Sequence, residues 1–269
     1  MANLQKAYLG MQCFWGAEST FAKLDGVLAT RVGYAGGTTQ APNYRNIGDH
    51  TEITEVQFDE KIISYDKILD YFWEHHDPTI EYKKQYKSAI LYVDDQQKET
   101  AKKSLKKLQE KYGNRKLDTY VQKLIRFYQA EDYHQKYWLR CQTAIFKKLN
   151  LNNEEVVSSL LATKVNAFLA GYKNFDVLKQ LADQYRLDDD VIKLIESIAI
   201  TGGYGTRRRA SDCRLACWNF SLQFANFVHC IVCAMWTLLN VCLVFWVIPY
   251  YGVSGELVEW IGSRIKTSG

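Results

Sequence analysis

One cysteine near the start of the chain, Cys13, stands at the head of the hexapeptide Cys-Phe-Trp-Gly-Ala-Glu that ends at Glu18. Residues 7–14 read as a strand and a short amphipathic helix follows, so Cys13 lies where a helix begins. Free N–H groups and the helix dipole there stabilise a thiolate, the nucleophilic form of cysteine. Phe14 and Trp15 are placed to wall an apolar pocket. Periodicity alone favours the alternative, a buried thiol with two core aromatics, because lone cysteines are among the most buried residues.

The elements that must position this cysteine follow from the period of the apolar residues. Alternation or β-rich composition predicts strands over residues 7–14, 27–34, 52–58, 88–93 and 119–127. Apolar residues at helical spacing predict helices over residues 16–24, 65–75, 95–112 and 130–149. This order favours an α+β sheet with helices on one side over a purely parallel doubly wound sheet. We predict a ferredoxin-like mixed sheet with packed helices.

The second half of the chain changes character and suggests a division into segments. Apolar clusters between residues 151 and 200 predict three or four short helices, and a Gly-Gly-Tyr-Gly run at 202–205 predicts a hinge. We therefore expect a domain that carries Cys13 at residues 1–150 and a small helical appendage at 151–201. A Gly/Arg-containing hinge would follow at 202–226, a hydrophobic helix at 227–248 and a short tail at 249–269.

Composition excludes several classes of protein. Hydrophobic residues make up 47% of the 269-residue chain, charged residues 24%, and there are 3 prolines, which excludes a disordered chain or a collagen-like repeat. The net charge is +4 and is nearly balanced over residues 1–206, so we expect no nucleic-acid partner. The N-terminus has no basic segment followed by an apolar run. We therefore expect a cytoplasmic catalytic domain in which the seven cysteines are reduced.

A long uncharged segment lies near the C-terminus. Residues 215–255 contain no Asp, Glu, Lys or Arg, and the 22 residues from Phe227 to Ile248 are long enough to span a bilayer. An excess of arginine before this segment places that side in the cytosol. We predict a C-terminal membrane anchor at 227–248. Two alternatives stay open: a buried hairpin of a globular core, and a tail derived from an alternative exon or read-through translation.

His75, His76 and Asp77 form the one cluster that suggests a metal. Cysteine and further carboxylate ligands at metal spacing are missing around them, so we predict no metal site. The segment fits better as the end of a helix that its own side chains cap.

Seven blocks of sequence carry a family resemblance. Residues Gly10 to Glu18 resemble the nucleophile motif of the A-type peptide methionine sulfoxide reductases. Six further blocks follow in the family's order: 33–37 (GYAGG), 42–45 (PNYR), 50–52 (HTE), 72–79 (FWEHHDPT), 85–90 (QYKSAI) and 130–135 (AEDYHQ). Together they cover roughly residues 7–140, about half of the chain.

The resemblance implies a role for each matching residue. Cys13 would be the nucleophile and Glu52 the acid that protonates the sulfoxide oxygen. The phenols of Tyr44 and Tyr86 would donate hydrogen bonds to that oxygen. The substrate's S-methyl group would be held by the apolar pair Phe14 and Trp15.

The resemblance also implies the reaction and its partners. The family reduces the S epimer of methionine sulfoxide, free or in proteins, and leaves a sulfenic acid on the nucleophile. A second thiol then forms a disulfide, and thioredoxin supplies the electrons. No cofactor is implied.

The sequence departs from the family pattern in two places around the site. The loop between Tyr44 and Glu52 is shorter than in bacterial members, as in a shortened eukaryotic form. Residues 79–84 replace the family's Gly-Asn-Asp-His-Gly run, so its aspartate is absent and Glu81 is a weak substitute. Without the resemblance, Glu52 reads as an outward strand residue, and Tyr44 and Tyr86 as half-buried tyrosines.

The resolving cysteine is a further departure. The family usually carries it in a mobile, Gly-rich C-terminal segment, and residues 202–205 match that description. Cys213 and then Cys217 are the resulting candidates. Cys141 is a poorer one, because it lies on a predicted helix that cannot swing.

Two other functions fit the same cysteine. One is a general thiol peroxidase that uses Cys13. The other is a membrane-anchored redox-sensing or interaction module with a reactive Cys13 and no efficient turnover, which the missing aspartate and the unusual tail suggest.

Overall fold

The computed structural model of the protein describes residues 3–203. Its strands form one six-stranded sheet in the order β5-β4-β1-β3-β2-β6, in which β4 and β5 pair in parallel and every other pair is antiparallel. The strands are β1 (Leu4–Gly10), β2 (Val27–Ala35), β3 (Thr51–Asp59), β4 (Ser88–Tyr92), β5 (Thr119–Lys123) and β6 (Phe127–Gln129). The described part of the chain is therefore an α+β fold with a mixed sheet, as predicted.

The two edge strands of the sheet are joined by only three residues, 124–126. A flat sheet of six strands spaced about 4.8 Å apart would separate its edges by about 24 Å. The four steps from Lys123 to Phe127 span at most about 15 Å at about 3.8 Å per Cα–Cα step. The sheet therefore curls into a half-barrel, and Phe127 packs against Tyr8 of β1 with ring centroids 5.5 Å apart.

The outer face of the curled sheet carries the main core. Helices α1 (Phe14–Phe21), α2 (Tyr65–Glu74) and α3 (Asp95–Tyr112) bury apolar side chains there against β1, β2, β3 and β4. A smaller cluster fills the inner face, around Tyr8, Ile53 and Leu91. The arrangement confirms that these helices cover one side of the sheet.

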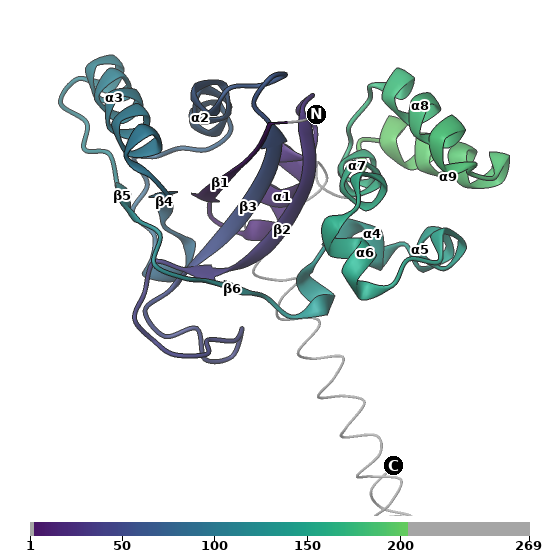
Figure 1. The fold of residues 1–269 in the computed structure, drawn as a ribbon, viewed down its shortest axis with the longest axis horizontal. Helices are drawn as coiled ribbons and strands as arrows, with labels where there is room; N and C mark the ends of the chain where they lie inside the picture. Colours follow the sequence, from purple (N-terminus) through teal and green to yellow (C-terminus); the bar gives the residue numbers. More distant parts are fainter. Residues whose placement is uncertain (1–2, 204–269) are drawn as a thin grey trace, which may run out of the picture. The chain divides into compact units, whose positions relative to one another are not determined.

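The remaining helices have a core of their own. They are α4 (Tyr137–Cys141), α5 (Thr143–Leu149), α6 (Asn153–Ser158), α7 (Leu160–Leu169), α8 (Phe175–Tyr185) and α9 (Asp189–Ile200). Helices α4, α5, α7, α8 and α9 share a cluster of buried residues that runs from Trp138 to Ala199 and includes the fully buried Phe168, and α6 contacts α7. Figure 1 shows this group beside β2, where α6 and α7 contact the strand. The last four of these helices are the short helices expected between residues 151 and 200.

The strand predicted at 7–14 ends at Gly10, and the helix predicted at 16–24 begins earlier, at Phe14. Two other predicted elements are divided in the structure. The predicted strand 119–127 is two strands on opposite edges of the sheet. The predicted helix 130–149 is broken: the 3-10 turn η2 (Asp132–His134) precedes α4, and Lys136 between them adopts a left-handed conformation with φ 51°. Gln142, with ψ 72°, then separates α4 from α5. The division of the predicted strand and the break at Lys136 both involve contacts with distant residues, which local periodicity does not contain.

Several predictions lie beyond the described residues. The hinge after Gly203, the hydrophobic helix at 227–248 and the tail at 249–269 all fall there. Among residues 3–203, no helix is both long enough and apolar enough to cross a bilayer. The ferredoxin-like label and the boundary at residue 150 stay predictions.

Candidate active site

Cys13 is the N-cap residue of α1. Strand β1 ends at Gly10, which allows close packing, because a Cβ there would lie 2.9 Å from the backbone oxygen of Lys87. Gln12 then turns the chain with φ 60°, and the carbonyl of Cys13 accepts hydrogen bonds from the first turn of the helix. The cysteine is half-buried. This position at the N-terminal end of a helix is the one that favours a thiolate.

Glu52 lies beside the first turn of the same helix. It is a buried residue of β3, with 1% of its surface exposed. Its Oε2 accepts a hydrogen bond of 3.1 Å from the backbone N–H of Phe14, and its Oε1 accepts one of 2.8 Å from Nε2 of Gln85. The carboxyl group is therefore held by the residue that directly follows Cys13.

Aromatic rings gather around the side chain of His134. Its ring centroid lies 5.1 Å from that of Phe14, 5.6 Å from Trp15, 4.6 Å from Tyr44 and 4.2 Å from Tyr133. The structure therefore brings three of the predicted site residues together from two distant stretches of sequence. His134 stands inside the last matched block, but no role for it was predicted from the sequence.

The protonation state of His134 follows from its partners. The indole Nε1 of Trp15 donates a 3.0 Å hydrogen bond to Nδ1 of the histidine, and because indole is only a donor, Nδ1 is an acceptor. Burial lowers the pKa of His134 to about 4, although nearby Glu131 opposes the shift. The ring is therefore neutral at pH 7, with its proton on Nε2. That atom is buried without a hydrogen-bond partner among the described residues.

Tyr44 lies on the loop between β2 and β3 and is half-buried. Its backbone N–H donates to Oε1 of Glu131 at 3.0 Å, while the phenol of Tyr34 donates to Oε2 of the same carboxylate at 2.9 Å. At the base of the loop, Asp49 accepts hydrogen bonds from Thr38 and Thr39, and these bonds hold the pKa of its carboxyl well below the usual range. The shortened loop is therefore tied at two points, one of which faces the site.

Tyr86 directly follows a residue that contacts Glu52. It is the last residue of the 3-10 turn η1 (Lys84–Tyr86), directly after Gln85, whose side chain contacts Glu52. The hydroxyl of Thr51 anchors the start of this turn by donating to the carbonyl of Lys84 at 2.7 Å. Glu81, the weak substitute for the missing aspartate, is exposed.

Comparison with known proteins identifies the family. The model of the peptide methionine sulfoxide reductase family matches residues 5–164, more than half of the chain. The chain belongs to this family. A peptide methionine sulfoxide reductase of Drosophila melanogaster is 42% identical over 179 residues, which cover 66% of this chain and 73% of that protein.

Other members of the family also match. The peptide methionine sulfoxide reductase MsrA of Methanococcus maripaludis is 43% identical over 155 residues, or 54% of this chain and 98% of that protein. Among solved structures, methionine sulfoxide reductase A of Corynebacterium diphtheriae is 31% identical, with a TM-score of 0.48 over 53% of this chain and 77% of that chain. The family model and the two curated relatives make this chain an A-type enzyme that reduces methionine sulfoxide in a thiol-dependent reaction. Family membership gives no support to the non-catalytic membrane module.

The His-His-Asp segment of this reductase contacts the backbone. Nδ1 of His75 lies 2.8 Å from the carbonyl oxygen of Tyr71, and Nδ1 of His76 lies 2.7 Å from that of Phe72. The side chains therefore cap the end of α2, as predicted. Within residues 3–203, no group of three or more His, Cys, Asp or Glu side chains is arranged to hold a metal ion.

The cysteines predicted to resolve the sulfenic acid, Cys213 and Cys217, lie outside the described residues. Cys141 is exposed at the last position of α4.

Proposed function

We propose that Cys13 attacks the sulfur of methionine S-sulfoxide while Glu52 supplies the proton for the sulfoxide oxygen. The S–O bond breaks, the oxygen passes to the sulfur of Cys13 as a sulfenic acid, and the thioether of methionine leaves. Tyr44 and Tyr86 donate hydrogen bonds to the sulfoxide oxygen as negative charge develops on it. The substrate is methionine S-sulfoxide, free or in oxidised proteins.

The placement of Glu52 carries this proposal. Its carboxyl group is buried and hydrogen-bonded to the backbone N–H of Phe14, so it lies one residue away from the nucleophile along α1. An acid must reach the oxygen atom that the nucleophile displaces, and a carboxyl group fixed at the N-terminal turn of the helix meets that need. The hydrogen bond from Gln85 holds its other oxygen.

The aromatic residues around His134 support an apolar methyl pocket. Phe14 and Trp15 are buried, and the ring of Trp15 is held in place by its hydrogen bond to His134. A rigid aromatic wall accepts a methyl group and excludes water from the reacting sulfur. The neutral imidazole adds no charge to this pocket.

The enzyme returns to its starting state through a second thiol. We propose that Cys213, or else Cys217, attacks the sulfenic acid, which forms a disulfide with Cys13 and releases water. Thioredoxin then reduces this disulfide by thiol–disulfide exchange. The family resemblance supports this assignment.

Trapping the sulfenic acid tests the first step. The full chain, reduced and then freed of reductant, is mixed with methionine S-sulfoxide and dimedone, which reacts with sulfenic acids. We expect mass spectrometry to find the adduct on Cys13, and to find much less after treatment with the R epimer. Formation of the adduct with hydrogen peroxide, and none with the sulfoxide, would instead indicate a thiol peroxidase.

Counting thiols tests the resolving step. One turnover of the full chain without reductant should consume two thiols, and Cys213→Ser should reduce the loss to one. Cys217→Ser and Cys141→Ser serve as matched variants. Consumption of one thiol in Cys141→Ser, with two still consumed in Cys213→Ser and Cys217→Ser, would overturn the assignment to Cys213.

The order β4-β1-β3-β2, with α1 and α2 as the crossing helices, supports the ferredoxin-like label for the core of the catalytic domain.

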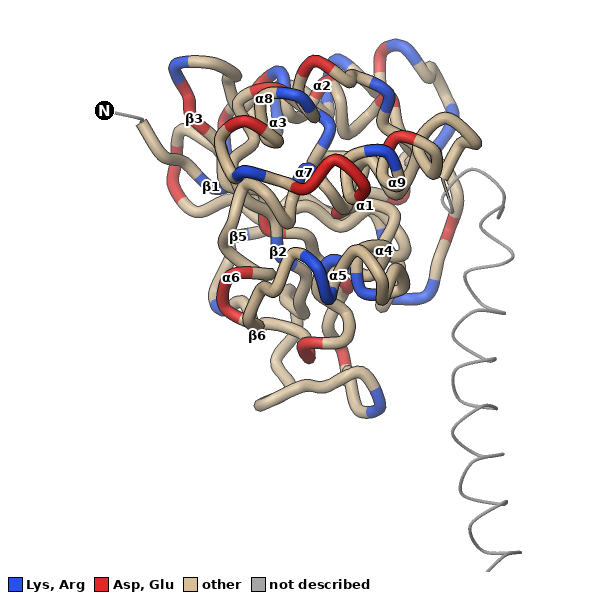
Figure 2. The backbone as a smooth tube through the Cα atoms, turned by 90° about the vertical axis from the view of Figure 1, so that its right-hand side faces the viewer, with Lys and Arg blue, Asp and Glu red and all other residues tan. Residues whose placement is uncertain are grey.

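Charged residues of both signs are interspersed over the described elements (Figure 2), which supports the absence of a nucleic-acid partner. We keep 1–150 and 151–201 as the catalytic domain and helical appendage.

The membrane anchor rests on sequence alone. The apolar run at 227–248 would hold the catalytic domain at the cytosolic surface of a membrane. Alkaline carbonate extraction of cells that express the full chain tests this: an anchored chain stays in the pellet, and release into the supernatant rules out a spanning helix.

A further inference from the structure

Five consecutive residues, 134–138, hold helix α1 and strand β2 together; we refer to them as the clamp segment. His134 accepts the indole N–H of Trp15. The side-chain amide of Gln135 bonds to both backbone groups of Val32, with its Oε1 accepting at 2.9 Å and its Nε2 donating at 2.8 Å. The segment therefore occupies the place of a neighbouring strand beside β2 while it contacts the helix that begins at Cys13.

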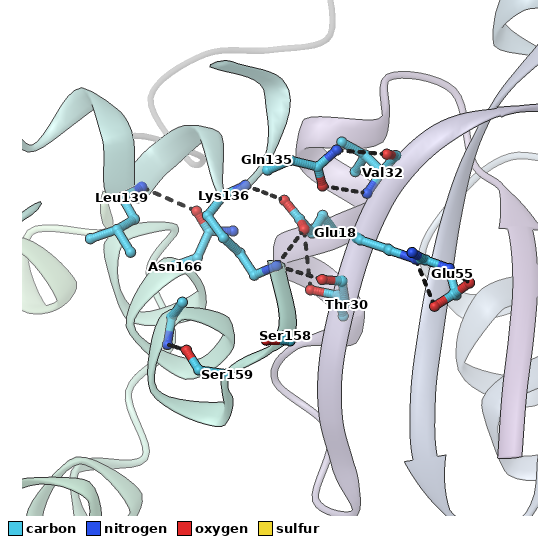
Figure 3. Close-up of polar contacts among 12 residues, drawn as sticks. Glu18, Thr30, Val32, Glu55, Gln135, Lys136, Leu139, Ser158, Ser159 and Asn166 are labelled. Atoms are coloured by element: carbon cyan, nitrogen blue, oxygen red, sulfur yellow. Dashed lines mark hydrogen bonds and ion pairs between the residues drawn. The ribbon is translucent and has the colours of Figure 1, made fainter. Parts of the chain in front are cut away.

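Lys136 forms the centre of the clamp segment (Figure 3). Its ammonium donates to Oε1 of Glu18 at 2.9 Å, and its backbone N–H donates to Oε2 of the same carboxylate at 2.9 Å. Thr30 completes the network through its carbonyl, which accepts from the ammonium, and its hydroxyl, which donates to Glu18. Both charged side chains are completely buried.

This ion pair is costly for a protein that needs only stability. Removing two charges from water is unfavourable, and apolar residues of similar volume often stabilise a fold as well or better. Lys136 also adopts a left-handed backbone conformation, which is unfavourable for a residue with a side chain. The pair instead fixes the orientation of Lys136 relative to Glu18, because both carboxylate oxygens of Glu18 are hydrogen-bonded to that one residue.

The two residues after Lys136 contact Trp15 directly. The ring of Tyr137 stacks on the indole with centroids 3.7 Å apart and an angle of 7° between the planes. The indole N–H of Trp138 donates to the backbone carbonyl of Trp15 at 3.3 Å. Glu18 lies one helical turn after Trp15, so the ion pair sets the position of Lys136, and through it the rings that lie against the pocket wall.

We propose that Lys136 and Glu18 are positioning residues that set the orientation of Trp15 and thereby let the enzyme distinguish methyl sulfoxides from larger alkyl sulfoxides. This inference rests on the proposed function, in which Trp15 walls the methyl pocket. Neither residue touches the substrate; each acts through the clamp segment.

Kinetics with two substrates test the proposal. Lys136→Met and Glu18→Gln are compared with the parent chain on methionine S-sulfoxide and its S-ethyl analogue, ethionine sulfoxide. We expect the ratio of kcat/KM for the methyl over the ethyl substrate to fall about 10-fold, mainly through a higher KM for the methyl substrate, because a pocket that selects by one methylene is worth about 10–200-fold. An unchanged ratio in folded variants would overturn the proposal.

A double variant separates the effect of the ion pair on the position of Trp15 from its effect on the stability of the fold. Glu18→Leu combined with Lys136→Met replaces the ion pair with apolar side chains, which keep such sites folded. We expect its unfolding temperature to be at least that of either single variant. We expect its ratio of kcat/KM for the methyl over the ethyl substrate to stay lowered. Recovery of the parent ratio would show that the ion pair does not position Trp15.

Lys164→Met is the matched control. Lys164 is also a buried lysine that contacts the end of α1, but its ammonium bonds to the carbonyls of Ala22 and Leu24, away from Trp15. We expect this variant to lose stability and to keep the parent ratio of methyl over ethyl turnover. A lowered ratio in the control would mean that any loosening of α1 has the effect, and would overturn the specific role of Lys136.

A measurement that does not depend on turnover separates the positioning role of Lys136 from the proposed function. In protein labelled with 5-fluorotryptophan, the ¹⁹F resonance of Trp15 is identified by its absence in Trp15→Phe. We expect this resonance to shift or broaden in Lys136→Met and to stay unchanged in Lys164→Met. If the resonance responds while the parent chain reduces no sulfoxide, the proposed function fails and the positioning role stands. If the parent is active and the resonance does not respond, the positioning role fails.

Discussion

Helix α1 is held at both ends by a buried side chain from a distant part of the chain. At its N-terminal end, the carboxyl group of Glu52 accepts a hydrogen bond from the backbone N–H of Phe14. At its C-terminal end, the ammonium of Lys164 donates to the carbonyls of Ala22 and Leu24 at 2.9 and 2.7 Å. Both contacts satisfy backbone groups that a helix leaves without partners, and a carboxyl and an ammonium at these ends suit the helix dipole.

The two ends differ in what surrounds the contact. The N-terminal end carries the half-buried Cys13 and the group of aromatic rings around His134. At the C-terminal end, Lys164 is 5% exposed and lies on α7, within the helical group beside β2. In the proposed mechanism, the same kind of contact therefore serves catalysis at one end and packing at the other. Substitutions at the N-terminal end should change rates, and those at the C-terminal end should change stability.

The largest effect is expected for Cys13→Ser. A serine hydroxyl has no thiolate to offer the sulfoxide sulfur, so turnover should be lost completely with thioredoxin or dithiothreitol as reductant. The serine keeps the N-cap position, and the temperature of unfolding should change little. Full activity of this variant would contradict the assignment of the nucleophile.

Glu52→Gln tests the acid at the same end. The amide oxygen can still accept the hydrogen bond from Phe14, but the group has no proton to give to the sulfoxide oxygen. We expect the formation of the sulfenic acid to slow by about 10²–10⁴-fold, the usual contribution of a general acid, with little change in substrate binding. Single-turnover kinetics measure this step apart from reduction by thioredoxin. A rate equal to that of the parent would remove Glu52 from the mechanism.

Gln85→Leu removes the hydrogen bond on the other oxygen of Glu52. Hydrogen bonds to an ionisable group are worth about 1.5–3 kcal/mol, so we expect about a 10-fold loss in the rate of the same step. Gln109→Leu is a suitable control, because that exposed amide on α3 bonds only to nearby carbonyls, at Gly113 and Arg115. Equal effects of the two substitutions would show that Gln85 has no special role at the site.

Much of the fold was predictable from the sequence because its elements have a strong local period. Helix α3 occupies residues 95–112 as predicted, β2 is one residue longer than predicted at its C-terminal end, and β3 is one residue longer at each end. The strand predicted at 119–127 was wrong because its two halves pair with opposite edges of the sheet. A period of two indicates a strand, but it does not say which partner the strand meets.

The residues at the site likewise divide into those that could be predicted from the sequence and those that could not. The proposed nucleophile and acid could be named because they stand in short blocks that resemble a family. His134 and the ion pair between Lys136 and Glu18 could not, because each depends on a contact across more than 100 residues. A buried lysine looks like a surface lysine in a sequence, since only the folded chain brings the carboxylate to it.

The smallest effect on activity, and the clearest on stability, is expected for Lys164→Met at the C-terminal end of α1. Burial lowers the pKa of Lys164 to about 8 in the folded chain, against 10.5 for an exposed lysine. Between these pH values the unfolded chain binds a proton that the folded chain does not, so the contribution of this group to stability rises with pH across the window. Methionine cannot titrate, and it leaves the carbonyls of Ala22 and Leu24 without their donor.

The free energy lost on substitution should therefore be smaller at pH 7 than at pH 10. We expect the difference between the parent and Lys164→Met to grow by about 1–3 kcal/mol as the pH rises from 8 to 10.5, since each unit of pKa shift corresponds to about 1.4 kcal/mol. Urea unfolding of both chains at several pH values measures it, and their difference cancels the other titrating groups. At pH 7, kcat/KM should stay within about twofold of the parent, because the chemistry lies at the opposite end of the helix. A large loss of activity in the folded variant would show that the two ends of α1 are coupled, and the separation of catalysis from packing would then be wrong.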